Sequence, residues 1–233
     1  MSDPGDAVTR PDPASGPEEL SYEVRPAAGA PEGALVLMHG RGTDERDLLP
    51  LVDELDPTRR LIGITPRGPL SLPPGGRHWY ALGGIPTPNP ETFHPTYAAL
   101  TAFVDRLPQA TGVPWERIVL GGFSQGAVMS YAVGLGRGRP TPAAILALSG
   151  FLPEVPDFEL ELAGRHGLRV AIGHGSHDPI IPVRFGQQAA ERLAGAGLDV
   201  TYRESPMPHT VDPRFLAELR PWLESAIAAG VRG

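Results

Sequence analysis

The stretch IVLGGFSQGAVMSY, residues 118–131, decides the fold. It begins as an apolar run typical of a buried strand and continues, directly after Ser124, into a run that predicts a helix. Gly122 and Gly126 flank the serine in a G-x-S-x-G pattern, and such small residues let neighbouring backbones approach a sharp strand-to-helix turn. This turn would display the serine hydroxyl above a sheet. The alternative is an ordinary turn in which Ser124 only caps the helix.

Strands and helices alternate along the rest of the chain. The expected strands are residues 34–38, 61–65, 118–123, 143–148, 169–174 and 200–204, and the expected helices are residues 44–55, 95–107, 125–135, 182–193 and 213–229. Most of the strand runs are continuously apolar, which predicts one α/β domain with a mostly parallel sheet and helices on both faces. Ligands of such sheets bind beyond the carboxyl ends of the strands.

Smaller features refine this pattern. Residues 22–25 alternate in polarity and predict an antiparallel edge strand. Pro95, Pro182 and Pro213 are expected in the first turns of their helices, where a missing N–H is tolerated.

Two segments lie outside the alternation. Residues 1–20 are rich in Pro, Gly, Ser and Asp and predict a disordered arm, which leaves residues 21–233 as a single domain. Residues 66–93 contain 12 Gly or Pro together with several large apolar side chains. We expect this long loop to form an ordered wall over a site.

Composition excludes whole classes of chemistry. All 20 basic residues are Arg and the chain has no Cys, which excludes lysine and thiolate nucleophiles, a P-loop lysine and thiolate metal sites. The net charge is 20 − 27 = −7, and without residues 1–20 it is 19 − 22 = −3, so nucleic acid is not an expected partner. No apolar run approaches the roughly 18 residues that cross a bilayer. We expect a cytoplasmic protein without a stable membrane anchor.

An acid and a histidine follow Ser124 in the order that a serine nucleophile requires. Asp178 lies in the loop after the expected strand 169–174, and His209 lies in the loop after the strand 200–204. Because carboxyl ends of parallel strands meet at one edge of a sheet, we expect the three side chains to meet. A metal cluster of His174, His177 and Asp178 is a weaker alternative, because a distant fourth ligand is lacking.

The remaining histidines have simpler interpretations. We interpret His39, His78, His94 and His166 as structural or surface groups.

An oxyanion hole needs two N–H donors near the attacked carbonyl. One comes from the residue after the nucleophile, Gln125, and one comes from the loop after the first strand. In that loop Gly40 and Gly42 free the backbone of Arg41 to turn its N–H inward. The alternative is a plain loop before a helix capped by Thr43 or Asp44.

Several motifs occur in a distinctive order along the chain: HGRG (39–42), RHWY (77–80), GGFSQG (121–126), SGFLP (149–153), HGSHDPIIP (174–182) and His209. Together they resemble the phospholipase/carboxylesterase family of α/β-hydrolases, which includes acyl-protein thioesterases, over roughly residues 22–228. The resemblance implies an α/β-hydrolase fold and a serine hydrolase of esters or thioesters without a cofactor. It implies Ser124 as nucleophile, His209 as general base, Asp178 as orienting acid, and the N–H groups of Arg41 and Gln125 as oxyanion hole.

One residue departs from the thioesterase members of the family. Arg41 stands where they usually have an apolar residue, and in this it is similar to an H-G-R-G subgroup of bacterial small-molecule esterases. Its side chain has two candidate roles. It either pairs with Asp44 or Asp47 in the same loop, which the acidic neighbours favour, or binds an anionic group of the substrate.

We therefore expect a carboxylesterase that cleaves small-molecule esters through an acyl-enzyme on Ser124. A lysophospholipase or acyl thioesterase is the alternative among enzymes, and a non-catalytic, ligand-binding relative is the alternative outside them. The partner is a small-molecule ester, no metal is expected, and the chain is expected to be a monomer or homodimer. Candidates for the substrate-binding wall are Trp79, Tyr80, Leu82, Phe151, Leu152 and Met207.

Overall fold

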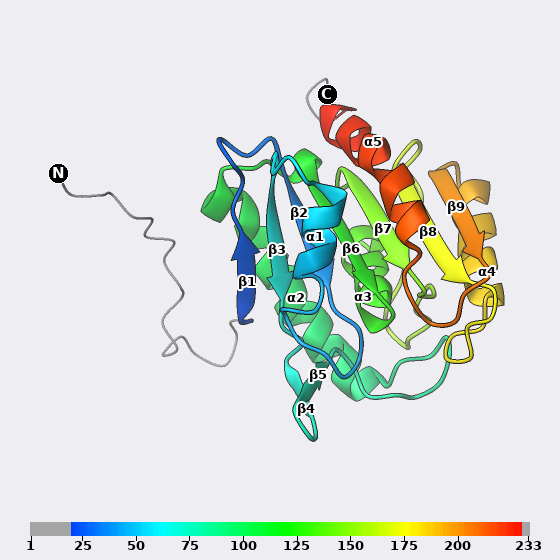
Figure 1. Ribbon diagram of the computed structural model, residues 1–233. Helices are drawn as coiled ribbons and strands as arrows, with labels where there is room; N and C mark the ends of the chain where they lie inside the picture. The colour runs from blue at the N-terminus through cyan, green and yellow to red at the C-terminus, as the bar shows by residue number, and fades with distance from the viewer. Residues whose placement is uncertain (1–19, 230–233) are drawn as a thin grey trace.

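A seven-stranded sheet forms the centre of the molecule in a computed structural model, which describes residues 20–229 (Figure 1). The strands lie in the order β1-β3-β2-β6-β7-β8-β9. Their bounds are β1 Tyr22–Arg25, β2 Gly33–Met38, β3 Leu61–Pro66, β6 Ile118–Phe123, β7 Ala144–Leu148, β8 Arg169–Gly175 and β9 Asp199–Ser205. The edge strand β1 is antiparallel to β3, and every other neighbouring pair is parallel. The predicted mostly parallel sheet and its antiparallel edge are thus confirmed.

Helices cover both faces of the sheet. They are α1 Leu49–Leu55, α2 Pro90–Thr111, α3 Gln125–Leu135, α4 Arg184–Gly195 and α5 Pro213–Ala229, and a short 3-10 turn, Trp115–Arg117, precedes β6. Figure 1 shows α1 and α5 on the near face and α2, α3 and α4 on the far face. Successive side chains of a strand point to opposite faces of the sheet. Because helices cover both faces, nearly every position of β2, β6 and β7 is buried, and this explains why these strand sequences are apolar without alternation. The edge strand β9 is more exposed.

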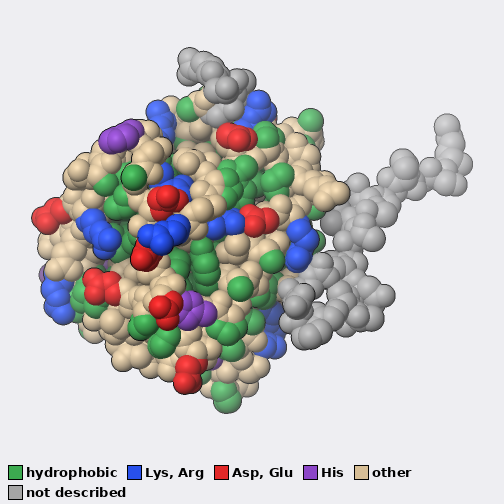
Figure 2. Space-filling view, turned by 180° about the vertical axis from the view of Figure 1, so that it is seen from behind, with side chains coloured by type: hydrophobic (Ala, Val, Ile, Leu, Met, Phe, Trp, Pro, Cys, Tyr) green, Lys and Arg blue, Asp and Glu red, His purple; other side chains and the backbone are tan. Residues whose placement is uncertain are grey.

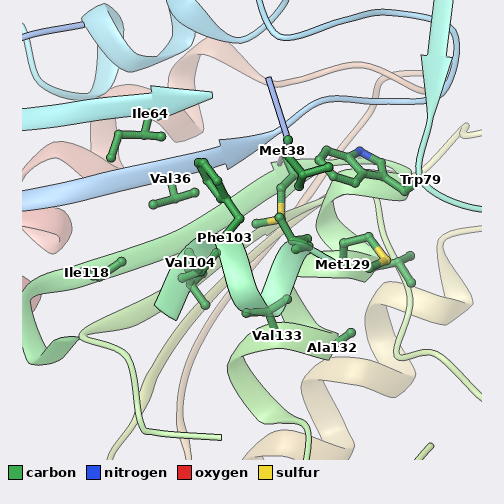
Figure 3. Close-up of a cluster of buried hydrophobic side chains, with 14 of the residues drawn as sticks. Val36, Met38, Ile64, Trp79, Phe103, Val104, Ile118, Met129, Ala132 and Val133 are labelled. Atoms are coloured by element: carbon green, nitrogen blue, oxygen red, sulfur yellow. The ribbon is translucent and has the colours of Figure 1, made fainter. Parts of the chain in front are cut away.

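The core between the sheet and α2 and α3 shows this packing in detail (Figure 3). Val36 and Met38 of β2 contribute to it, whereas Leu35 and Leu37 of the same strand belong to the cluster under α1 and α5. Burying each such side chain fully stabilises the fold by about 1.5–3 kcal/mol. The strands are therefore held firmly from both faces, and the loops at their carboxyl ends begin from fixed positions.

Two helix starts differ from the sequence prediction. α1 begins at Leu49 instead of residue 44, because residues 44–48 form turns in which Asp44 Oδ1 accepts the Arg46 N–H at 3.0 Å. Pro50 thereby lies in the first turn of α1, where its missing N–H breaks no helical hydrogen bond. α4 begins at Arg184, so Pro182 precedes that helix instead of lying in its first turn.

α2 begins five residues earlier than predicted. Its cap is Asn89, whose side-chain oxygen accepts the Thr92 N–H at 3.3 Å, and Pro90 is its first residue. Pro95 is consequently inside the helix, where it withholds one hydrogen bond from the Glu91 carbonyl. The third expected first-turn proline, Pro213, is the first residue of α5.

The loop predicted at residues 66–93 contains regular structure. β4 Leu70–Leu72 and β5 Gly76–His78 form a small antiparallel hairpin. The hairpin contacts the loop after β2, because Gly42 N–H donates to the Arg77 carbonyl at 2.8 Å and Arg77 N–H donates to the Thr43 carbonyl at 2.8 Å. The ordered loop thus borders the carboxyl edge of the sheet.

Residues 1–19 of the predicted arm lie outside the described residues. Leu20, the last residue assigned to that arm, is buried in the core with α2. Among residues 20–229, no helix is both long and apolar enough to cross a membrane. On the face opposite α1 and α5, arginine and acidic side chains are interspersed, without a dominant basic area (Figure 2).

Candidate active site

The turn between β6 and α3 holds Ser124 in a strained backbone conformation. Its φ of 55° and ψ of −119° are rare for a residue with a side chain. Gly126 faces the loop after β2 so closely that a Cβ there would lie 1.8 Å from the Met38 carbonyl oxygen, and a Cβ at Gly122 would lie 2.5 Å from the same atom. Only glycine fits at either position, which explains the G-x-S-x-G spacing.

Ser124 directly precedes α3, but its side chain makes no capping hydrogen bond. Instead, Ser124 Oγ lies 2.9 Å from Nε2 of His209. His209 Nδ1 lies 2.6 Å from Asp178 Oδ2. The structure thus brings together the three residues that the sequence singled out, from the ends of β6, β8 and β9.

Asp178 is fixed in its loop by backbone donors. Its Oδ1 accepts the N–H groups of Ile180 and Ile181, each at 2.8 Å, while Oδ2 receives His209. The side chain is fully excluded from solvent. Three hydrogen bonds therefore hold the carboxyl group in place, and because its oxygen accepts from Nδ1 of His209, that nitrogen carries the proton.

The imidazole of His209 also has an apolar support. The ring of Phe123, the residue before Ser124, lies with its centroid 4.7 Å from that of His209 and tilted by 43°. This contact limits rotation of the imidazole about its hydrogen bonds. Together, Phe123 and Asp178 hold Nε2 toward the serine.

His174, one of the alternative metal ligands, has a structural role beside this site. It is buried, and its Nε2 donates to the Ile181 carbonyl at 2.8 Å. Burial lowers the pKa of His174 below its ordinary value, and the nearby His209 adds to this effect, while the Ile181 carbonyl and Asp178 oppose it. His177 is exposed, and among residues 20–229 no group of three or more His, Asp or Glu side chains is arranged to hold a metal ion.

The two expected oxyanion donors lie on neighbouring segments. Gln125 is the first residue of α3, so its backbone N–H has no acceptor within the helix. Arg41 lies in the loop after β2, and in the described part of the chain its N–H has no acceptor either. Neither Thr43 nor Asp44 caps α1, because that helix begins only at Leu49.

The Arg41 side chain is exposed and makes no ion pair within residues 20–229. The pairing with Asp44 or Asp47 that the sequence favoured is therefore not formed. Asp44 is instead bonded to the N–H of Arg46.

The candidates for the substrate wall divide by burial. Trp79 and Tyr80 are 0% and 2% exposed, so they belong to the core and not to an open wall; Figure 3 shows Trp79 beside Met38 and Met129. Phe151 and Leu152 are also buried, against α3 and α4. Of the six candidates, only Leu82 and Met207 are accessible to solvent. The expectation of an open wall is wrong for Trp79 and Tyr80, because hydrogen bonds to a buried side chain hold the backbone of these two residues in the protein interior.

Sequence reasoning missed the side chain that makes those hydrogen bonds. Gln125 accepts the Trp79 N–H at 3.0 Å and donates to the Tyr80 carbonyl at 2.9 Å. Nothing in the sequence links Gln125 to a residue 46 positions earlier. His39, which the sequence predicts to be a structural or surface group, has a structural role: it is buried and accepts the Gly68 N–H on Nε2 at 2.9 Å.

The sheet order, the strained serine turn and the order of Ser124, Asp178 and His209 define an α/β-hydrolase. The sequence model of the phospholipase/carboxylesterase family matches residues 21–227, and the chain belongs to that family. This confirms the predicted resemblance and places the chain among hydrolases of esters and thioesters.

Individual relatives agree with this membership. Acyl-protein thioesterase 1 of Gibberella zeae is 29% identical over 224 residues, which cover 88% of this chain and 94% of the relative. Acyl-protein thioesterase 1 of Mycosarcoma maydis is 37% identical over 124 residues, but that match spans only 50% of this chain and 51% of the relative. The crystal structure of the Bacillus cereus carboxylesterase superposes with a TM-score of 0.77 at 21% identity, covering 89% of this chain and 94% of that one, and confirms the α/β-hydrolase fold.

Proposed function

We propose that the protein is a carboxylesterase that hydrolyses small-molecule carboxylic esters through an acyl-enzyme on Ser124. The observation that carries the proposal is a pair of consecutive hydrogen bonds. Ser124 Oγ lies 2.9 Å from His209 Nε2, and His209 Nδ1 lies 2.6 Å from Asp178 Oδ2. A serine hydroxyl is a weak nucleophile until a positioned base removes its proton, and this arrangement supplies the base and its orienting acid.

The reaction follows from the roles of these atoms. Ser124 Oγ attacks the acyl carbon while His209 Nε2 takes its proton, and Asp178 stabilises the imidazolium that forms. The N–H groups of Gln125 and Arg41 donate to the developing oxyanion. When the tetrahedral intermediate collapses, the bond to the alcohol breaks and His209 returns the proton to the leaving oxygen. Water then attacks the acyl-enzyme by the same route and releases the acid and free Ser124.

Two other readings remain for the same site. The relatives named acyl-protein thioesterase support a thioester substrate, because the same acyl transfer would serve both bonds. Against a protein thioester stands Arg41, an exposed charged residue where a long apolar acyl chain would favour an apolar one. A non-catalytic relative is disfavoured because Ser124, His209 and Asp178 are all in bonding distance.

A fluorophosphonate probe tests the central claim, since it reacts only with an activated serine. We expect the wild-type protein to be labelled with one equivalent on Ser124. The variant Ser124→Ala should not be labelled, and Ser176→Ala, in the loop that carries Asp178, should be labelled like the wild type. Folded wild-type protein that does not react would defeat the proposal.

Substrate preference is tested with an oxygen ester and a thioester of the same short acyl group. We expect the larger kcat/KM on the oxygen ester, and the reverse ranking would favour the thioesterase reading. The cytoplasmic location and the monomeric or dimeric state stay predictions.

A further inference from the structure

The Gly40 carbonyl, next to the expected oxyanion donor Arg41, is held by two side chains. His39 Nδ1 lies 2.7 Å from the Gly40 oxygen, and the Thr43 hydroxyl donates to the same oxygen at 3.0 Å. A carbonyl oxygen can only accept, so Nδ1 of His39 carries a proton. The opposite nitrogen, Nε2, accepts the N–H of Gly68 at 2.9 Å and is therefore unprotonated. The two contacts fix one neutral tautomer of His39.

The surroundings keep this imidazole neutral. His39 is 1% exposed, and burial lowers its pKa below the ordinary value, although the Gly40 carbonyl and the acidic residues Asp47, Asp44 and Glu45 act in the opposite direction. In the tautomer that the two contacts fix, the neutral imidazole donates from Nδ1, and its acceptor is the Gly40 carbonyl.

The direction of the Gly40 carbonyl determines the direction of the Arg41 N–H. The peptide bond between them is trans, so its C=O and N–H point to opposite sides. The loop that contains Gly40 packs closely against Phe123, the residue before Ser124: a Cβ at Gly40 would lie only 3.1 Å from the Phe123 ring. Holding the carbonyl toward His39 and Thr43 thus turns the unbonded Arg41 N–H to the other side of the peptide.

The second expected donor is connected to the same residues. The indole N–H of Trp79 donates to the His39 carbonyl at 2.8 Å, and the backbone N–H of Trp79 donates to the side chain of Gln125 at 3.0 Å. Trp79 is fully buried between the two segments. The loop of Arg41 and the start of α3 at Gln125 are therefore joined by hydrogen bonds in the protein interior.

We propose that Thr43 is a positioning residue for the oxyanion hole: its hydroxyl and the His39 imidazole hold the Gly40 carbonyl away from the site, so that the Arg41 N–H faces the developing oxyanion. The inference rests on the proposed function, and it assigns Thr43 no contact with substrate. The hydroxyl is the part of this arrangement that can be removed without changing the shape of the side chain.

The test compares Thr43→Val, which removes the hydroxyl and keeps the branched shape, with Thr43→Ser, which keeps the hydroxyl. Loss of an oxyanion donor lowers kcat by about 10²–10³-fold, and a loosened donor should lower it less, so we expect about a tenfold loss of kcat in Thr43→Val. KM for a small aryl ester should change little, and Thr43→Ser should retain most of kcat. Thr58→Val, on a turn remote from the serine, is the matched control.

Inhibition by phenylboronic acid, which forms a tetrahedral adduct with an active serine, separates positioning from folding. We expect its Ki to rise in Thr43→Val by about the same factor as kcat falls, because the adduct uses the oxyanion hole. A partly folded preparation has fewer active molecules but an unchanged Ki, so this measurement does not depend on the folded fraction. An unchanged Ki or kcat in Thr43→Val, or equal losses in the Val and Ser variants, would overturn the inference. Fluorophosphonate labelling of the wild type shows separately whether the proposed function itself holds.

Discussion

The side-chain oxygen of Gln125 accepts the backbone N–H of Trp79, a residue 46 positions earlier in the chain, at 3.0 Å. The amide nitrogen of the same side chain donates to the Tyr80 carbonyl at 2.9 Å. Both backbone groups belong to buried residues, and Gln125 itself is only 4% exposed. One amide thus satisfies both polar groups and attaches the segment after β5 to the turn that carries Ser124.

Replacing Gln125 by Met should destabilise the protein strongly. The variant keeps a side chain of similar length and the backbone N–H, but it leaves the Trp79 N–H and the Tyr80 carbonyl buried and unpaired. Each such group costs about 1–3 kcal/mol, so we expect the free energy of unfolding to fall by about 2–4 kcal/mol in urea denaturation. Gln188→Met, at an exposed position of α4, should leave it unchanged. Equal stability of the two variants would show that water replaces the amide.

Much of the fold was predictable because burial on both faces leaves a simple signature. Most strands of the parallel sheet are apolar without alternation, and stretches with a helical pattern lie between them, so the order of these elements along the chain predicts the layers. Helix starts were less predictable. At α2 the Asn89-Pro90 pair marks the cap, but Pro95, five residues later, gives an equally plausible first-turn signal.

The site was predictable where it depends on chain order and not where it depends on side-chain contacts. Ser124, Asp178 and His209 follow strands whose carboxyl ends share one edge of the sheet, so their meeting follows from topology. The prediction of an open wall at Trp79 and Tyr80 is wrong, because both side chains are buried. Their burial depends on the hydrogen bonds to Gln125, and no local pattern in a Gly- and Pro-rich loop reveals a partner so distant in sequence.

The variant Asp178→Asn should lower kcat while retaining the fold. Its amide oxygen can still accept the N–H groups of Ile180 and Ile181, but the other position no longer holds a carboxylate for His209 Nδ1. A corresponding change in serine proteases reduces kcat by about 10⁴-fold, and we expect a loss of about 10³–10⁴-fold here.

The control for this variant is Asp212→Asn. Asp212 lies three residues after His209 but hydrogen-bonds to Ser205 and to the start of α5, without touching the serine, the histidine or Asp178. It should therefore keep nearly all of kcat on the same ester. If both variants lose activity to the same extent, the loss reports disorder of the loop and not the role of Asp178.

Acidification should destabilise the fold partly through His174. Burial lowers its pKa in the folded state, whereas in the unfolded chain it titrates near the usual value of about 6.5. As pH falls below that value, the unfolded chain gains a proton that the folded protein does not bind, so the free energy of unfolding decreases toward the lowered pKa. The hydrogen bond to the Ile181 carbonyl, followed by Asp178 and Glu204, opposes this lowering of the His174 pKa, and His209 adds to it.

Urea denaturation at pH 8 and pH 5 measures this contribution. The loss of stability between the two pH values should be smaller in His174→Gln, which has no proton to gain, than in the wild type. His166→Gln, at an exposed position, should show the wild-type loss. An identical pH dependence of the wild type and the His174 variant would contradict the assignment.

The exposed Arg41 side chain gives the last prediction, which concerns substrate choice. Arg41 makes no ion pair within residues 20–229, although Asp44 and Asp47 are close in sequence, so its guanidinium is available to a substrate. A guanidinium binds a carboxylate through two parallel hydrogen bonds. Arg41→Leu keeps the backbone N–H. On two esters that differ only in a carboxylate or a carboxamide, we expect kcat/KM to fall about tenfold more on the anionic ester.

The control for this prediction is Arg46→Leu, in the same loop, which should leave the ratio of kcat/KM on the anionic ester to kcat/KM on the neutral ester unchanged. Added salt should reduce the wild-type preference, because an exposed charge is screened. Equal losses on both esters would show that Arg41 acts only through the geometry of its loop.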